Sequence, residues 1–226
     1  MSLNSLPPDL RRLTLSLLDD VDLTNILPIK NRLLQSSLDR TFWLNKIVNK
    51  YGLTYDQIEK YRKKNTHAAY YNKLNQDTTN KTPWNILFLG SNIGREDLVR
   101  IGLKRGADPH AENDQALINS SSHGHIEIVR LLLAAGADPH AQYDYALRLA
   151  SQNGHTEIVR LLLENGADPH ALNDAALRDA SANGHTEVVR LLLENGADPH
   201  ADNDEALRYA RYNGHTEVLE LLREYS

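Results

Sequence analysis

The sequence predicts an all-α fold, a solenoid of about five helix-turn-helix repeats that follows a smaller helical domain. Two observations predict it. The first is a thirty-residue segment that occurs twice in succession, as YDYALRLASQNGHTEIVRLLLENGADPHAL and then as NDAALRDASANGHTEVVRLLLENGADPHAD. The second is the spacing of apolar residues in each copy, which is typical of helices with one buried face. A short fixed period indicates units that bury their apolar sides by stacking on one another.

Three regions follow one another along the chain. Residues 1–50 are predicted to form the small helical domain, residues 51–82 a connecting helix and a linker, and residues 83–226 the repeats. The turn-rich stretch that ends at Pro83 marks the boundary of the array. The predicted repeats are residues 83–112, 113–142, 143–172, 173–202 and the shorter 203–226.

Each repeat is predicted to contain two short helices and a segment that connects it to the next repeat. This connecting segment is named here the finger. In the fourth copy we expect the side chain of Asp174 to cap the first helix and Gly184 to end it in the left-handed conformation. Thr186 begins the second helix, whose residues 188–193 are apolar almost all round, so this helix is the expected buried member of the pair. After it, Pro199 favours an extended exit.

Three motifs recur in the repeats: a Gly-His pair such as Gly154-His155, the helix Glu-Ile/Val-Val-Arg-Leu-Leu-Leu, and the run Gly-Ala-Asp. With these motifs, residues 83–226 resemble ankyrin repeats. The period of thirty departs from the usual thirty-three, and Asp-x-Ala-Leu-Arg replaces the opening Thr-Pro-Leu-His. We therefore expect a tight loop in place of the β-hairpin finger. The resemblance implies a protein-binding array and no enzyme activity.

The first fifty residues carry a different pattern. It comprises Leu6-Pro7, Asp9-Leu10, a leucine-rich helix, Asp22-Leu23, Ile29, Asp39 and Phe42-Trp43. This stretch resembles an F-box, which implies binding to the Skp-type adaptor of a cullin-RING ubiquitin ligase. So short a helical segment buries too little surface to fold without a partner. The alternative partner is the array itself, which these helices would cap. The residues that would bind the adaptor are Leu6, Pro7, Leu10, Leu13, Leu23, Ile26, Ile29 and Trp43.

Residues 54–75 are predicted to be helical and basic, beginning with a capping box at Thr54 and Gln57. Lysines and tyrosines alternate beyond this start, a pattern that also occurs in nucleic-acid-binding proteins. We favour a solvated helix face with tyrosines packed beneath it. No nucleic acid is expected as a partner.

The composition excludes several classes of protein. There is no cysteine, so disulfides and thiolate chemistry are excluded. Neither a signal peptide nor a membrane span is expected, because no apolar run is long enough. Residues 1–112 carry 17 basic and 12 acidic side chains, whereas residues 113–226 carry 8 basic and 18 acidic ones. An acidic array argues against binding to phosphates. We expect an intracellular, cytoplasmic protein.

Eight of the ten histidines are spaced fifteen residues apart, from His110 to His215. This spacing suggests metal binding, but the two histidines of one repeat would lie at opposite ends of a helix, about 15 Å apart. Ligands of one zinc ion lie about 2 Å from the metal. Structural roles are therefore expected, with the Gly-His member bonded to loop backbone. No catalytic motif is present. We predict no catalytic residue, cofactor or metal, and a metal protein or hydrolase is the most distant hypothesis.

Some positions differ between the copies while most agree. Within the first helix they lie at i, i+4 and i+7, on one face, and the residue leading into that helix varies as well. Drift of exposed positions after duplication is one explanation, and binding on the concave side of the stack is the one we favour. The predicted target-binding residues are Gln142, Tyr145, Leu149, Gln152, Leu172, Asp179, Asp202, Glu205, Tyr209 and Tyr212.

Together these features predict a substrate receptor. The N-terminal helices would dock on the ligase adaptor while the array presents a target protein for ubiquitylation. F-box-like segments joined to short ankyrin arrays resemble proteins encoded by large DNA viruses, notably those of amoebae. That resemblance implies a factor acting on host proteins in the host-cell cytoplasm. The alternative function is a binding module or scaffold that sequesters a partner without recruiting a ligase.

Overall fold

The computed structural model describes residues 40–226, and every regular element in that range is a helix. The chain divides into two compact units, Met1–Asn80 and Lys81–Ser226. The division lies close to the predicted boundary at Pro83, because the turn-rich residues before that proline separate the units. The predictions made for residues 1–39 lie outside the described part of the chain.

The described part of the first unit is a cluster of three helices, α4 (Arg40–Tyr51), α5 (Tyr55–Arg62) and α6 (His67–Thr78). The indole of Trp43 packs against the ring of Tyr71, with centroids 5.4 Å apart, so α4 and α6 share one core. The predicted capping box of α5 is present at Thr54 and Gln57. The segment expected to be a connecting helix and linker is thus two helices, and α5 and α6 both contact α4.

The helix predicted over residues 54–75 is interrupted. Lys63 follows α5 with a φ of 53°, a value that residues of a right-handed α-helix do not adopt. A new helix starts after Thr66, whose hydroxyl accepts a hydrogen bond from the backbone N–H of Ala69. The threonine is a favourable N-cap, so α6 begins independently of α5.

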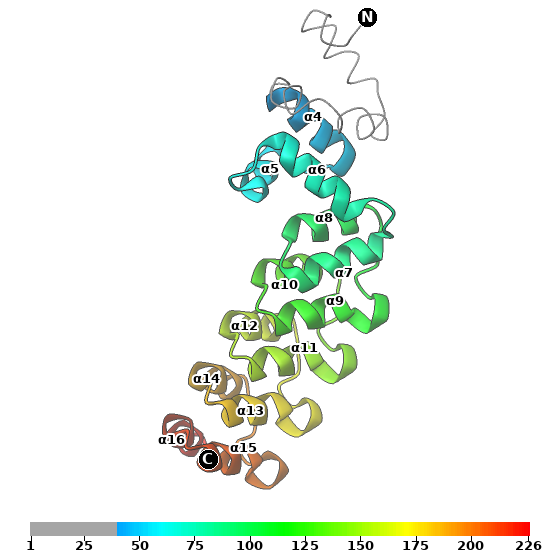
Figure 1. Ribbon diagram of the computed structural model, residues 1–226. Coiled ribbons are helices and arrows are strands. Elements are labelled where there is room, and N and C mark those ends of the chain that lie inside the picture. The colour runs from blue at the N-terminus through cyan, green and yellow to red at the C-terminus, as the bar shows by residue number, and fades with distance from the viewer. Residues whose placement is uncertain (1–39) are drawn as a thin grey trace, which may run out of the picture. The chain divides into compact units, whose positions relative to one another are not determined.

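The second unit is an array of five helix pairs (Figure 1). The first helices of the pairs lie in one layer and the second helices in another, and each helix contacts its counterpart in the next pair. The pairs are α7 (Pro83–Ile93) with α8 (Glu96–Lys104), α9 (Ala111–Ser122) with α10 (Ile126–Ala134), α11 (Ala141–Gln152) with α12 (Thr156–Glu164), α13 (Ala171–Asn183) with α14 (Thr186–Glu194), and α15 (Ala201–Asn213) with α16 (Thr216–Glu224).

The core runs continuously through the array. Val159, Leu162 and Leu192 of the second helices are fully buried, as are Leu177 and Ala180 of a first helix. Five of the nine residues of α14 are buried, as expected, but α13 buries six of its thirteen, so both helices of the pair supply the core and the second is not its single buried member. The predicted helix end at Gly184 is confirmed, because this glycine adopts a left-handed conformation with a φ of 75°.

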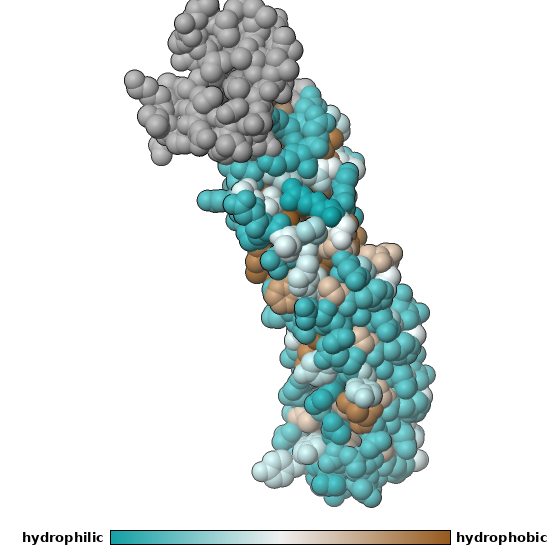
Figure 2. Space-filling model, turned by 90° about the vertical axis from the view of Figure 1, so that its right-hand side faces the viewer, coloured by the Kyte–Doolittle hydropathy of each residue, from teal (hydrophilic) through white to brown (hydrophobic). Residues whose placement is uncertain are grey.

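The fingers differ from the expectation at one point. Each begins with a short turn after proline and then places three consecutive residues in the left-handed region, as at Leu172, Asn173 and Asp174. The right-handed helix starts only after them, and Asp174 does not cap it. The fingers project along one side of the array, and this side is largely hydrophilic with small hydrophobic patches (Figures 1 and 2).

Candidate protein-binding surface

A buried aspartate in each inner repeat connects its finger to the next one. The Oδ1 atom of Asp114 accepts a hydrogen bond of 2.7 Å from the backbone N–H of Asp138. Asp144 and Asp174 accept corresponding bonds of 2.8 Å from Asp168 and Asp198. Each bond runs from the finger at the start of a repeat to the finger at its end, and it occupies a carboxylate oxygen that was expected to cap the following helix.

A histidine flanks each of these carboxylates. The Nδ1 atom of His140 lies 3.1 Å from Asp144 Oδ1, and the other three fingers have the same pair. Burial raises the pKa of Asp144 above its usual value, because removal from water penalises the charged carboxylate. The hydrogen bond from Asp168 and the nearby imidazole oppose this shift. The finger histidines therefore help to compensate buried negative charge.

The second histidine series also connects the repeats. The Nε2 atom of His185 lies 3.0 Å from the carbonyl oxygen of Gln152 in the preceding repeat, and His155 and His215 make the equivalent contacts. The expectation that the Gly-His member bonds to loop backbone is thus confirmed. Within residues 40–226 no group of three or more His, Cys, Asp or Glu side chains is placed to hold a metal ion.

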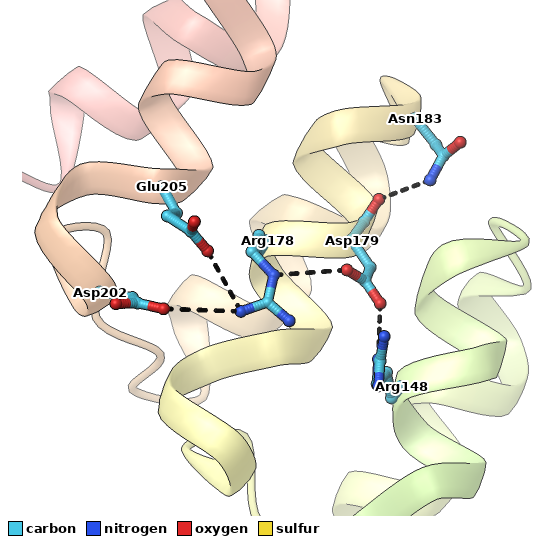
Figure 3. A network of polar contacts seen from close by, with 6 residues as sticks. All are labelled: Arg148, Arg178, Asp179, Asn183, Asp202 and Glu205. Carbon is cyan, nitrogen blue, oxygen red and sulfur yellow. Dashed lines mark hydrogen bonds and ion pairs between the residues drawn. The ribbon is translucent and has the colours of Figure 1, made fainter.

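The candidate surface is the face formed by the variable positions of the first helices and the finger residues before them, named here the first-helix face. Its middle part is filled by polar contacts between repeats (Figure 3). Arg148 Nε donates to Asp179 Oδ2 over 2.7 Å, from α11 to α13. Arg178 lies 3.3 Å from Glu205 in the following repeat and 3.9 Å from Asp202 at the end of its own repeat. Three predicted binding residues are therefore engaged within the array.

These ion pairs are partly exposed, and pairs of this kind contribute about 0.2–1 kcal/mol each. The hydrogen bond from Arg148 to Asp179 raises the pKa of the guanidinium, which stays charged. Their main effect is geometric. They fix long side chains in one arrangement across the surface that joins three repeats.

The family of the repeats is decided by the sequence match. A family model described as "Ankyrin repeats (3 copies)" matches residues 87–173 and again residues 147–226. Together the two matches span more than half of the chain. The protein belongs to the ankyrin-repeat family. A comparison with curated proteins finds no significant match to this chain. Ankyrin repeats are protein-binding modules, so the array is a surface for a protein partner.

The ankyrin array exposes the predicted binding residues to different degrees. Tyr145 and Leu149 are half-buried and pack against the core, so the expectation that they are exposed anchors is wrong. Tyr212 and Tyr209 on α15 are 88% and 41% exposed. Gln142, Gln152, Leu172 and Asp202 are exposed as well.

Two features of the ankyrin array were missed in the sequence. Tyr143 is 74% exposed at a finger position that is asparagine in the three other fingers. This one exception among the copies is the signal that would have identified it. Arg148 and Arg178 occupy equivalent positions, and an acidic residue follows each of them about one repeat later. That spacing would have indicated the ion pairs.

Of the predicted adaptor contacts, only Trp43 lies within the described residues. Its side chain is 2% exposed and belongs to the core of the first unit. It therefore supports folding of that unit and offers little surface to a partner. No helix among residues 40–226 is long and apolar enough to cross a membrane.

Proposed function

We propose that this protein captures a target protein on the first-helix face, with Tyr209 and Tyr212 as the principal anchors. The supporting observation is that these two rings stand exposed about one helical turn apart on α15. Tyrosines are enriched among the side chains that contribute most to binding energy at interfaces. Arg208 and Arg211 are exposed beside them and supply hydrogen-bond donors to the same partner.

The array is well suited to binding because its surface is ordered before the partner arrives. The Asp–finger bonds and the ion pairs of Arg148 and Arg178 hold the backbone and the side chains in place. Binding to such a surface loses little conformational entropy, so more of the contact energy contributes to affinity.

A second step of the proposal concerns the N-terminal residues. Residues 1–50 recruit a Skp-type adaptor and its cullin ligase, so that the captured protein is ubiquitylated. The F-box-like sequence pattern supports this step, and the resemblance to proteins of large DNA viruses supports a role in acting on host proteins. The competing function is sequestration of the target, which needs the same array and no ligase.

Target capture is tested with the full chain carrying Tyr209→Ser and Tyr212→Ser. Both side chains are exposed, so the melting curve should change little while recovery of targets from cell lysate falls at least tenfold. Tyr225→Ser is the matched control, because Tyr225 is 44% exposed but lies at the end of the array after α16. Equal recovery by the double variant and the control would refute these anchors.

Ligase recruitment is tested separately with Leu10→Asp and Leu13→Asp in the full chain. These changes place charges at predicted adaptor contacts and leave the array unaltered. We expect the variant to lose the adaptor and the cullin from the pull-down while it retains the targets. If the unaltered chain brings down no adaptor or cullin, the ligase step is wrong and sequestration stands.

A further inference from the structure

The fingers expose two large apolar side chains in addition to the tyrosines of α15. Tyr143 is 74% exposed and Leu172 is 49% exposed, and they belong to consecutive fingers. The side-chain Nε2 of Gln142 reaches the carbonyl oxygen of Asn113 on the preceding finger, 3.3 Å away. Leu172 and Tyr143 are the equivalents of Gln142 and Asn113 one repeat later, on fingers with nearly identical backbone angles, so we infer that the side chain of Leu172 lies close to Tyr143. The two side chains define an apolar patch, named here the finger patch.

The surroundings of the finger patch are acidic. The four finger segments 107–115, 137–145, 167–175 and 197–205 contain eleven acidic residues, four histidines and no lysine or arginine. Lys104 and Arg105 precede the first finger segment, and Arg148, Arg178 and Arg208 each follow one of the other three segments by three residues. Small apolar patches in a largely hydrophilic surface are visible on this side of the array (Figure 2).

The charges flank the finger patch in a definite order. The residue that leads into the first helix is Glu112 in the first finger and Asp202 in the last, whereas Gln142 and Leu172 occupy this position in the two fingers between. Glu112 and Asp202 are both exposed. Asp202 lies 3.9 Å from Arg178 but keeps 43% of its side chain in solvent. The patch therefore lies between two acidic fingers.

The buried carboxylates add to this negative potential. Asp114, Asp144 and Asp174 are buried within the fingers, and the backbone N–H groups that stabilise them come from the next finger. Arg148 is paired with Asp179 on α13 and not with a finger carboxylate, whereas Arg178 offsets part of the charge of the last finger through Glu205 and Asp202. A cationic partner gains from this field, and an anionic one is repelled.

We propose that the finger patch binds a cationic segment of a protein, in which an apolar side chain covers Tyr143 and Leu172 and lysines or arginines on both sides face Glu112 and Asp202. This inference rests on the proposed function, since it names the chemistry of a partner of the array. Repeats packed about 8–10 Å apart place these two acidic fingers, three repeats from one another, about 24–30 Å apart. An extended chain covers the longer of these distances in about nine residues.

The probe is a labelled twelve-residue peptide with two arginines at each end and two leucines in the middle, titrated against the full chain in fluorescence anisotropy. We expect Glu112→Lys with Asp202→Lys to weaken binding at least tenfold at low salt. Leu172→Ser should weaken it several-fold, and the affinity of the unaltered chain should fall as salt increases. A peptide with serines in place of the leucines, and one with glutamates in place of the arginines, should both bind more weakly.

The matched control is Glu157→Lys with Glu187→Lys. It makes the same change of charge at residues whose side chains are 75% and 73% exposed on the second helices, away from the fingers. The control should change the affinity less than twofold. If it weakens binding as much as the finger variant does, the attraction is general and the finger patch is not the site. Equal binding of the glutamate peptide would also overturn the proposal.

Failure of the finger patch can be distinguished from failure of target capture by Tyr209 and Tyr212. The finger variant and the Tyr209→Ser, Tyr212→Ser variant are compared in the same lysate pull-down. Loss of targets with the tyrosine variant alone refutes the finger patch and leaves target capture by α15 intact. Loss with the finger variant supports the inference, and it does so whether or not a ligase is recovered.

Discussion

The second-helix layer and the first-helix face of the same array follow opposite rules. In the second helices the copies are almost identical. The apolar residues that they share are buried, and shared glutamates such as Glu157 and Glu187 are exposed. On the first-helix face the copies differ, and the differing residues are exposed, half-buried or ion-paired. The stack therefore separates two demands. The shared apolar positions supply stability, and the differing positions are the ones that we propose bind a partner.

The largest expected effect lies in the layer that the copies share. Leu162 of α12 is fully buried in the core, so Leu162→Ala removes packing and leaves a cavity. Such changes cost about 2–5 kcal/mol of the free energy of unfolding. Urea denaturation of the full chain measures it. Leu172→Ala is the control, because Leu172 is exposed, and a comparable loss there would mean that the finger residues also hold the stack together.

The finger aspartates allow the same comparison of a buried residue with an exposed one, here between two residues of the same type. Asp144→Ala leaves the backbone N–H of Asp168 without its acceptor, which should cost about 1–3 kcal/mol. Asp204 is the equivalent residue of the last described repeat, where its side chain is 53% exposed and pairs with His200. Asp204→Ala should change stability by less than half as much. Equal losses in denaturation would show that the bond between fingers contributes little.

These two residues also show why part of the structure was predictable. The glycine that ends α13, the capping box at Thr54 and the burial of α14 depend on neighbouring residues, and the local pattern is enough to predict them. The role of Asp174 was mispredicted because its donor, the backbone N–H of Asp198, comes from the next finger, twenty-four residues later. A local sequence pattern predicts hydrogen bonds from the backbone N–H groups of the helix that follows the aspartate, and it does not reveal a donor from a distant segment.

Dependence on distant residues also explains why the candidate surface was predicted only in part. The variable positions were found by comparing the copies, which needs no structure. Their exposure was not predictable, because it depends on how neighbouring repeats meet: Tyr145 packs against the core, while Asp179 is reached by an arginine thirty-one residues earlier. Tyr143 was missed because it lies in the finger and outside the helical positions that were compared.

At Tyr143 the requirement for stability and the proposed role in binding favour different residues. Its backbone is left-handed, with a φ of 58°, a conformation that asparagine tolerates and tyrosine does not favour. Tyr143→Asn should therefore raise the free energy of unfolding by about 0.5–1 kcal/mol. Asn173→Tyr is the reciprocal change and should lower it. Thermal denaturation of both variants checks the signs, and a loss of stability in Tyr143→Asn would contradict the argument from backbone conformation.

The smallest effect concerns the ion pairs of the first-helix face. A double-mutant cycle with Arg148→Ala and Asp179→Ala should give a coupling of about 0.2–1 kcal/mol, because the pair is partly exposed. Raising the salt concentration should reduce it further. If the cycle instead gives several kcal/mol, these variable positions hold the repeats together as the core does, and the distinction between a shared scaffold and a variable surface fails. A small coupling combined with altered target capture would mean that the pair orders the surface more than it stabilises the fold.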